Sequence, residues 1–304
     1  MSPSRQSGYR LLGSRFDYLL HTRPLEWPIV AGHAAVGYLL AVSLAGAVQG
    51  RLIGSAVLGI LLWVVCLNGG TLALNSAFDR DEGDIAYLHR PPSPPAHLAG
   101  FGFGLMLLGL VGSLLLPPEY RVAYAVCVVL SVLYSVPPVR LKAVPGADWI
   151  INMVGFGTLT LYAGWAATGL PLTPPARLVL LAFCPLFAAL YPLTQIYQFE
   201  EDARRGDRTL ARTIGIRGSL VVALIAMVVA FTLFAAAALA AGWNAQSRWR
   251  WLPLGMAGIA WAVVLVPWSR RHRAMTNQAH QRGMYQALLA WAITDLAVVV
   301  AWGV

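Results

Sequence analysis

The chain has 304 residues, of which 58% are hydrophobic and only 12% charged, and its formal net charge is +9. Globular proteins carry about 25% charged residues, so this composition excludes an ordinary soluble protein and makes a lipid bilayer the solvent for most of the chain. The positive charge does not indicate a nucleic-acid partner, because it is distributed as a membrane topology signal.

Nine apolar segments are long enough to cross a bilayer core, which takes roughly 20 helical residues. They lie at about 25–48, 53–78, 96–116, 119–137, 148–169, 177–199, 218–242, 252–268 and 284–303. Lipid offers backbone groups no partners, so each segment is expected to be a helix. We predict a single all-α membrane domain over residues 1–304, with 1–22 as a cytoplasmic N-terminal segment and nine transmembrane helices around a central apolar cavity.

Charged residues divide unevenly between the two ends of these helices. If the N-terminus is cytoplasmic, 17 of the 22 Lys and Arg residues lie inside and 5 outside. The positive-inside rule therefore predicts a cytoplasmic N-terminus and an outside C-terminus. Nine of the 13 acidic residues, Asp148 among them, fall in the same inside loops. The rule does not require this second asymmetry, which indicates a site on that face.

The first acidic segment is L-N-S-A-F-D-R-D-E-G-D, beginning at Leu74, at the end of the second span. Asn75 and Asp79 are four residues apart and share one helix face, and Asn68 extends that polar stripe into the membrane. Asp84 follows in the loop, where it could fold back toward Asp79. Oxygen ligands that converge from a helix end and its loop suit Mg²⁺ together with substrate phosphate.

The second acidic segment, 191–212, lies at the end of the sixth span and contains Q-F-E-E-D-A-R-R-G-D-R. Gln198 and Asp202 share one helix face, with Glu201 beside them, and Arg208 ends a run of arginines that could pair with phosphate oxygens. Two such segments on one face predict a pocket with a metal-binding floor and apolar walls. The alternative is a solvated loop of mixed charge.

The two segments resemble the signature of the UbiA-type intramembrane prenyltransferases, which carry Asn-x3-Asp-x3-Asp after the second helix and Asp-x3-Asp after the sixth. The other matching pieces are T-R-P-L-E-W-P at 22–28, Y-S-V-P-P-V-R-L-K at 134–142 and G-D-R-T-L-A-R-T-I-G at 206–215. Two positions depart from the pattern. Gly83 stands where the first motif has its last acid, with Asp84 one residue later, and Gln198 stands where the second motif begins.

The resemblance implies Mg²⁺-dependent transfer of a prenyl group from a prenyl diphosphate to a small aromatic or lipophilic acceptor, as in quinone and related lipid biosynthesis. Its partners would be that donor, that acceptor and membrane lipid. It implies a multi-pass protein of a bacterial-type inner (plasma) membrane with the active site facing the cytoplasm. The implied catalytic residues are Asn75, Asp79 and Asp202. The implied metal ligands are Asn75, Asp79 and Asp84 for one ion, and Asp202 with Glu201 or Glu200 for the other.

The residues that the resemblance assigns to substrate are Arg23, Arg140, Lys142, Gln198, Arg208 and Tyr134. Aromatic rings can stabilise an allylic cation through their π faces. The candidates are Tyr134, Phe156, Tyr162 and Tyr191, although each position is more often ordinary packing.

Several residues deeper in the spans carry separate expectations. His33 is expected to make an interhelical hydrogen bond. Asp295 is either functional or held by a structural partner, on a ninth helix expected outside the two motif-bearing bundles. Gly100 and Gly104 form a small-xxx-small pair that predicts a close helix contact.

Two other functions fit parts of the pattern. An intramembrane terpene cyclase would use the same metal site but quench the cation within its own substrate, so that it would release a hydrocarbon without an acceptor. A transporter or cation channel could carry acids at its mouth. The acids are confined to one face, and the interrupted inverted repeats of many transporters are not evident, which disfavours transport.

Overall fold

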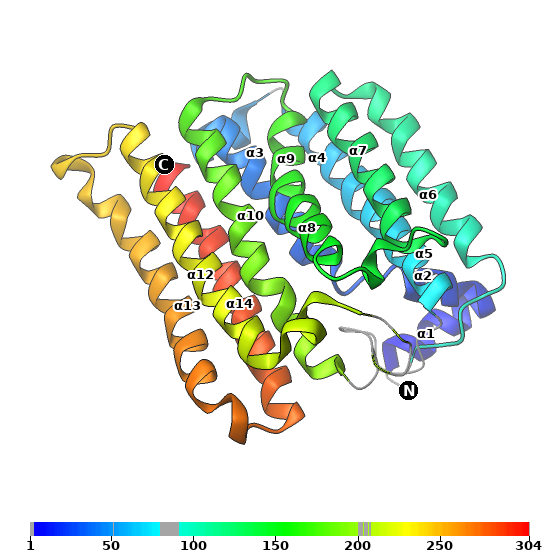
Figure 1. The fold of residues 1–304 in the computed structure, drawn as a ribbon. Coiled ribbons are helices and arrows are strands. Elements are labelled where there is room, and N and C mark those ends of the chain that lie inside the picture. The colour runs from blue at the N-terminus through cyan, green and yellow to red at the C-terminus, as the bar shows by residue number, and fades with distance from the viewer. Residues whose placement is uncertain are drawn as a thin grey trace.

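The computed structural model describes residues 3–50, 52–79, 91–199, 203, 206 and 208–303, and these contain helices and no strand (Figure 1). The α-helices are α1 (Pro3–Leu12), α2 (Phe16–His21), α3 (Trp27–Gln49), α4 (Ile53–Leu61), α5 (Gly69–Asp79), α6 (Leu98–Gly112), α7 (Pro118–Ser135), α8 (Ala147–Asn152), α9 (Thr160–Ala166), α10 (Pro174–Gln195), α12 (Leu210–Ala240), α13 (Trp251–Arg271) and α14 (Asn277–Trp302). Two π-helical segments, η2 (Leu62–Asn68) and η5 (Met153–Leu159), join α4 to α5 and α8 to α9.

Within the described residues, seven helical runs are long and apolar enough to cross a membrane. They are Trp27–Ala47, Ile53–Asp79, Leu98–Leu115, Pro174–Gln198, Leu210–Ala240, Gln246–Ala274 and Asn277–Trp302. The predicted fourth and fifth spans are also helical, as α7 and the run from α8 to α9, but they are not among the seven. Charged and polar residues near their starts lower their hydropathy: Glu119 and Arg121 in α7, and Asp148 and Asn152 in α8. The all-α membrane fold is confirmed, and the count of nine spans stays a prediction.

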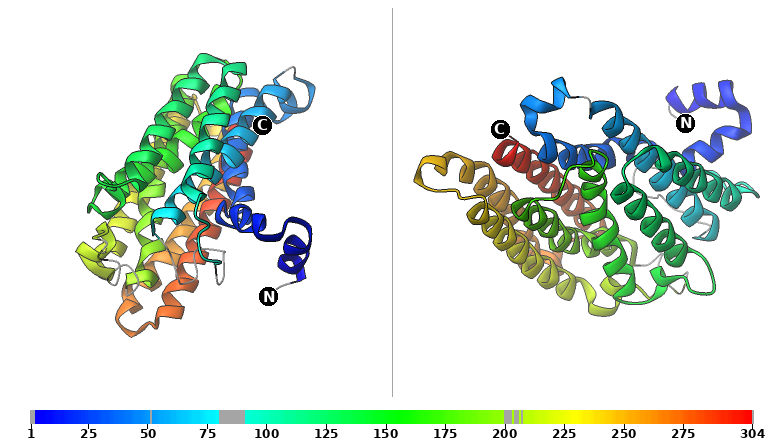
Figure 2. Two further views of the ribbon diagram at one scale, coloured as in Figure 1. Left: turned by 90° about the vertical axis from the view of Figure 1, so that its right-hand side faces the viewer. Right: turned by 90° about the horizontal axis from the view of Figure 1, so that it is seen from above.

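The outer surface of the bundle is apolar. Large exposed side chains lie along several helices, including Leu107, Leu108, Val122, Ile225, Val228, Ile259, Val263, Leu289 and Leu296. A soluble monomer rarely exposes so much contiguous apolar surface, whereas lipid covers it at no cost. The short helices α1 and α2 lie to one side of the bundle (Figure 2).

Two large hydrophobic cores, and a small third cluster around Tyr38, support the described part of the bundle. The larger is built mainly from α10, α12, α13 and α14, where α10 packs along α12 and α13 along α14. The smaller surrounds Trp63, Tyr120 and Tyr124 and joins the α4–α5 run to α6, α7 and α9. Phe156, on η5, packs against both cores. The helices around it therefore belong to two packing units that meet along one seam.

Close helix packing in the smaller core uses a different glycine from the predicted pair. A methyl group on Gly102 would lie 2.7 Å from the carbonyl oxygen of Gly70, and one on Gly70 would lie 2.7 Å from that of Gly102. By contrast, Gly100 and Gly104 have nothing within 4 Å of such a methyl. The prediction for Gly100 and Gly104 is wrong because α6 meets α5 through the face that carries Gly102. Two residues are a little over half a helical turn, so Gly100 and Gly104 lie on the opposite side of α6.

Candidate functional site

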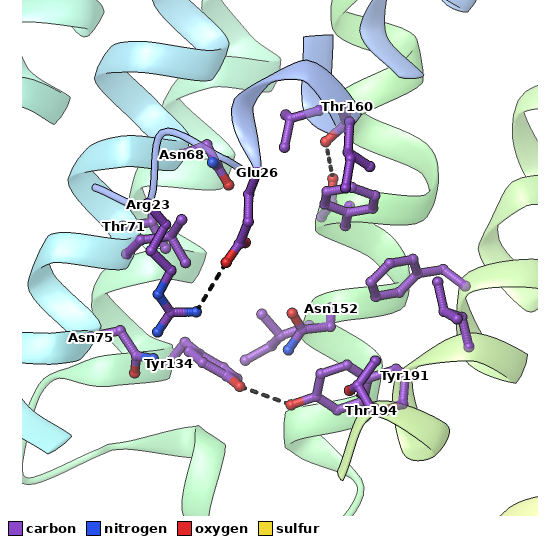
Figure 3. A pocket seen from close by; sticks show the side chains of 18 of the residues that line it. Arg23, Glu26, Asn68, Thr71, Asn75, Tyr134, Asn152, Thr160, Tyr191 and Thr194 are labelled. Carbon is purple, nitrogen blue, oxygen red and sulfur yellow. Dashed lines mark hydrogen bonds and ion pairs between the residues drawn. The ribbon is translucent and has the colours of Figure 1, made fainter. Parts of the chain in front are cut away.

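A cavity of about 410 Å³ lies along the seam between the two cores. Trp63 and Leu67 of the smaller core line one wall, and Phe187 and Trp291 of the larger core line the other. Polar side chains gather in its wall, as Figure 3 shows for Arg23, Glu26, Asn68, Asn75 and Asn152. The cavity is thus lined mostly by apolar side chains, with polar side chains grouped in part of its wall.

The end of α5 supplies the cavity with a carboxylate that forms two ion pairs. Asn75 and Asp79 both line it, one helical turn apart, as their spacing predicts. The Asp79 side chain is only 2% exposed and forms ion pairs with Lys142 and with Arg140, whose Nη2 lies 3.1 Å from Oδ1. Lys142 Nζ also donates to Asn75 Oδ1 at 3.4 Å. The structure therefore brings together four residues that the sequence assigned to one site.

The loop after α7 places these cations. Ser135, the last residue of α7, donates from its hydroxyl to Asn75 Oδ1 at 3.5 Å, which ties the ends of α7 and α5 together. The chain then turns back through Arg140, whose φ of 35° lies in the left-handed region. A residue other than glycine holds that conformation only where its surroundings impose it. The turn directs Arg140 and Lys142 at Asp79.

Aromatic side chains lie beside this polar end. Tyr134 of α7 and Tyr191 of α10 both line the cavity, and their hydroxyl oxygens are 2.8 Å apart, so the pair bridges the two walls (Figure 3). Phe156 also lines the cavity. Tyr162 does not; it lies at a separate shallow pocket beside Glu119. Three of the four candidate rings are therefore in place, and the fourth is not.

The acids of the second segment lie outside the described residues. Asp84 of the first segment, and Glu200, Glu201 and Asp202 of the second, all fall there. Gln198 and Thr209, on either side of the acids of the second segment, line the cavity. Arg208 is exposed and is not among the lining residues. Two described residues that flank these acids, Gln198 and Thr209, therefore lie at the cavity.

Several lining residues were not assigned to the site from sequence. Met284, Tyr285, Leu288 and Trp291 come from α14, so the ninth helix, which was expected outside the two motif-bearing bundles, contributes to the cavity wall. A periodic apolar helix carries no local signal of which neighbour it will face. Another lining residue that was missed is Glu26, a carboxylate at the start of the predicted first span.

Glu26 and Arg23 form a second ion pair in the cavity wall, with Arg23 Nη1 3.6 Å from Glu26 Oε1 (Figure 3). Both residues lie before Trp27, where the first span begins. Burial raises the pKa of the Glu26 carboxyl, and the Arg23 ion pair opposes this rise. Arg23, which the resemblance assigns to substrate, lines the cavity, and its ion-pair partner among the described residues is a carboxylate.

Asp148, which the sequence groups with the inside acids, has a different environment. Its side chain is fully buried and accepts hydrogen bonds from the backbone N–H groups of Gly146, at 2.9 Å, and Leu210, at 3.1 Å. The side-chain amide of Gln195 donates to it at 3.1 Å. Because Leu210 begins α12, this carboxylate joins α8, α10 and the N-terminus of α12, where negative charge is favourable.

His33 and Asp295 meet in the interior of the bundle. Asp295 Oδ1 lies 2.9 Å from His33 Nδ1, and the carbonyl oxygen of Gly157 lies 3.2 Å from His33 Nε2. The histidine ring is fully buried and stacks on Phe156. The interhelical hydrogen bond expected of His33 is confirmed, and Asp295 has a structural partner on α3.

Asn75 and Asp79 present an amide oxygen and a carboxylate side by side, which is chemistry that a hard divalent cation such as Mg²⁺ accepts. Among the described residues, no three His, Cys, Asp or Glu side chains come together as a metal site. Two oxygen ligands from helix α5 are nonetheless enough for a cation that keeps waters and shares a substrate phosphate.

Comparison with known proteins places the chain in a family. The sequence profile of the UbiA prenyltransferase family matches residues 29–291. The digeranylgeranylglyceryl phosphate synthase of Methanothrix thermoacetophila is 29% identical over 221 residues, which are 67% of this chain and 74% of that protein.

Solved structures share the fold. A UbiA homologue from Archaeoglobus fulgidus bound to GPP and Mg²⁺ matches with a TM-score of 0.65 and 20% identity, over 93% of this chain and 99% of that one. A structure described for digeranylgeranylglyceryl phosphate synthase matches with a TM-score of 0.68 and 17% identity, over 94% and 97% of the two chains. The family profile covers most of the 304 residues, and the chain belongs to the UbiA prenyltransferase family.

Proposed function

We propose that this prenyltransferase uses Mg²⁺ to transfer a prenyl group from a prenyl diphosphate to a small aromatic or other lipophilic acceptor, with release of pyrophosphate. The observation that carries the proposal is one cavity with two kinds of lining. Asn75, Asp79 and Lys142 meet at its polar end, and apolar side chains such as Trp63 and Phe187 line the rest. A prenyl diphosphate has the same two parts, a charged head and an apolar tail.

The proposed metal ligands are divided between the two acidic segments. Asn75 and Asp79 would hold one Mg²⁺ with Asp84, and Asp202 would hold another with Glu201 or Glu200. Bound Mg²⁺ supplies charge stabilisation for the departing diphosphate. Lys142 and Arg140, which pair with Asp79, would bind diphosphate oxygens through charge-assisted hydrogen bonds.

The remaining substrate contacts follow from the cavity lining. Tyr134 and Tyr191 stand beside the polar end, where the electron-rich faces of their rings favour an allylic cation. The apolar walls keep water away from that cation until the acceptor reacts. Gln198 and Arg23, which also line the cavity, complete the proposed substrate set, and Arg208 would need to turn inward from its exposed position.

We also propose the topology predicted from charge, with nine spans in a single domain over 1–304, a cytoplasmic N-terminus and an active site that faces the cytoplasm of a bacterial-type cell. The excess of basic residues on that side supports it. The donor and metal of the Archaeoglobus fulgidus homologue, GPP and Mg²⁺, support the proposed substrate class. The curated relative is named for a digeranylgeranylglyceryl phosphate, which supports a lipid product as well as a quinone precursor.

The test is an assay of purified protein in lipid nanodiscs with Mg²⁺, radiolabelled geranyl, farnesyl and longer diphosphates, and a panel of aromatic and lipophilic acceptors. We expect prenylated acceptor and pyrophosphate, with turnover lost in Asp79→Ala and in Asp202→Ala. Full activity in both variants would contradict the proposed site. Release of a cyclic hydrocarbon without any acceptor would identify a terpene cyclase instead.

A further inference from the structure

Three polar atoms in one wall of the cavity lack hydrogen-bond partners among the described residues. They are Nε of Arg23, Nδ2 of Asn68 and Oε1 of Glu26, and all three atoms are buried. Glu26 Oε1 faces Arg23 Nη1 in the ion pair described above, but at 3.6 Å the two atoms are too far apart for a hydrogen bond. Their residues all line the cavity, and Figure 3 shows Glu26 and Arg23 pointing toward each other with Asn68 on the same side. A buried polar atom without a partner is costly, so a cluster of them beside a cavity indicates a ligand that supplies the missing bonds.

The chain holds these side chains in place from two directions. Arg23 has a φ of 51°, in the left-handed region, and Trp27 Nε1 donates to the carbonyl oxygen of Thr22 at 3.0 Å, which closes the turn between α2 and α3. Asn68 ends the π-helical segment η2. Strained turns and π-helical segments are both concentrated at functional sites. The local backbone therefore fixes the positions of Arg23 and Asn68 in the cavity wall.

The chemistry of the cluster selects one kind of ligand group. The Glu26 oxygen is a hydrogen-bond acceptor, whereas the Asn68 amide is a donor. A hydroxyl both donates and accepts, so it satisfies the two together. An anionic group on the ligand would be repelled by the Glu26 carboxylate. The Arg23 guanidinium would not offset this repulsion, because it already pairs with Glu26. Although Oε1 is buried, the Glu26 side chain as a whole is 20% exposed, and Glu26 lines the cavity.

We propose that this wall is the subsite of a hydroxyl-bearing acceptor, an alcohol or a phenol, and that Glu26 removes the proton from its reacting oxygen. The inference rests on the prenyl transfer proposed above. Because Asn75 and Asp79 would take the diphosphate end, the Glu26 wall is left for the second substrate. The raised pKa of the Glu26 carboxyl makes it a stronger base than an exposed glutamate.

The step balances without another reactant. The bond between the allylic carbon and the diphosphate oxygen breaks, and its electron pair leaves with the pyrophosphate. A lone pair of the acceptor oxygen forms the new carbon–oxygen bond, and the hydroxyl proton passes to the Glu26 carboxylate. Glu26 then returns the proton to water, for which its partial exposure gives access.

The experiment compares wild type, Glu26→Gln and Glu26→Asp in nanodiscs with geranyl diphosphate and Mg²⁺. The acceptors run from n-alkanols through phenol to 4-nitrophenol, together with ring compounds that lack a hydroxyl. The matched control is Glu119→Gln, because Glu119 is an exposed carboxylate outside this cavity. Thermal unfolding of each variant separates misfolding from chemistry, and Glu26→Asp, which keeps a carboxylate, gives a second comparison if Glu26→Gln is unstable.

We expect Glu26→Gln to lower kcat for alkanols and phenol about 100-fold, with donor binding unchanged, as for the loss of a general base. The loss should shrink to a few-fold with 4-nitrophenol in mildly alkaline buffer, where this phenol is largely ionised and needs no base. Equal losses across all hydroxyl acceptors, full activity of Glu26→Gln, or turnover only with acceptors that lack a hydroxyl would overturn the inference but leave the proposed function standing. No turnover of wild type with any acceptor would contradict the proposed function itself.

Discussion

Two buried aspartates, Asp79 and Asp148, differ in what they face. Asp79 lies in the cavity wall and pairs with the side chains of Lys142 and Arg140. Asp148 is not among the residues that line this cavity, and it accepts hydrogen bonds from two backbone N–H groups and one side-chain amide. Flexible cationic side chains can turn from a carboxylate to a diphosphate, whereas backbone groups at a helix start cannot. The difference indicates that Asp79 takes part in substrate binding and catalysis, whereas Asp148 stabilises the fold.

The largest expected effect is on the chemistry at Asp79. Asp79→Asn keeps the shape of the side chain but removes the charge that would bind Mg²⁺. We expect kcat to fall by roughly 10²–10³-fold, the usual cost of losing one electrostatic contact to the transition state. The unfolding temperature should change little, because water in the cavity can solvate Lys142. A large drop in that temperature with normal turnover would reverse the comparison with Asp148.

Asp148→Ala tests the other half of the comparison. It leaves the N–H groups of Gly146 and Leu210 without an acceptor, so we expect the free energy of unfolding to fall by about 3 kcal/mol. The measurement is a denaturant titration in mild detergent. Turnover per folded molecule at low temperature should stay within a few-fold of wild type. If kcat instead collapsed while stability held, Asp148 would belong to the active site.

Lys142→Met tests whether the cations around Asp79 also bind the diphosphate. The methionine keeps most of the volume but cannot bind a phosphate oxygen. We expect the KM or Kd for geranyl diphosphate to rise on the order of 10-fold, the effect of one charge-assisted hydrogen bond. A radioligand binding assay measures it. An unchanged affinity would show that Lys142 serves only to hold Asp79.

The smallest expected effect concerns Asp295, a third carboxylate. Its hydrogen bond with His33 lies inside the bundle, where such bonds contribute little because unfolded membrane helices also find partners. We expect Asp295→Leu to cost about 1 kcal/mol of stability and Asp295→Asn to cost less. Leu296→Ala, at an exposed neighbouring position, is the control. A several-fold loss of activity in Asp295→Asn at full stability would make this residue functional.

The parts of the site that could be predicted are the local ones. Asn75 and Asp79 share a helix face because four residues make about one turn, and their joint position in the cavity follows from that spacing. The apolar runs likewise predict the helices, since lipid permits little else. The roles of Arg140 and Lys142 came from the family resemblance, and the structure places both against Asp79.

The parts that could not be predicted depend on long-range packing. Nothing in the sequence of α14 shows that Trp291 faces the cavity, because the helix is apolar on several sides. The choice of Gly102 over Gly100 for the contact with α5 depends on how α6 is rotated, which only the neighbouring helix fixes. The same holds for Asp148, whose loop position looked functional until its backbone partners were known.

The most direct test of the central claim is binding of a donor that cannot ionise. Geranyl S-thiolodiphosphate can be titrated calorimetrically into wild type and Asp79→Asn, each with Mg²⁺ and with EDTA. We predict the tightest binding for wild type with Mg²⁺, and binding weakened at least about 10-fold by either the substitution or the chelator. Equal affinity under all four conditions would contradict a Mg²⁺–diphosphate site at the end of α5.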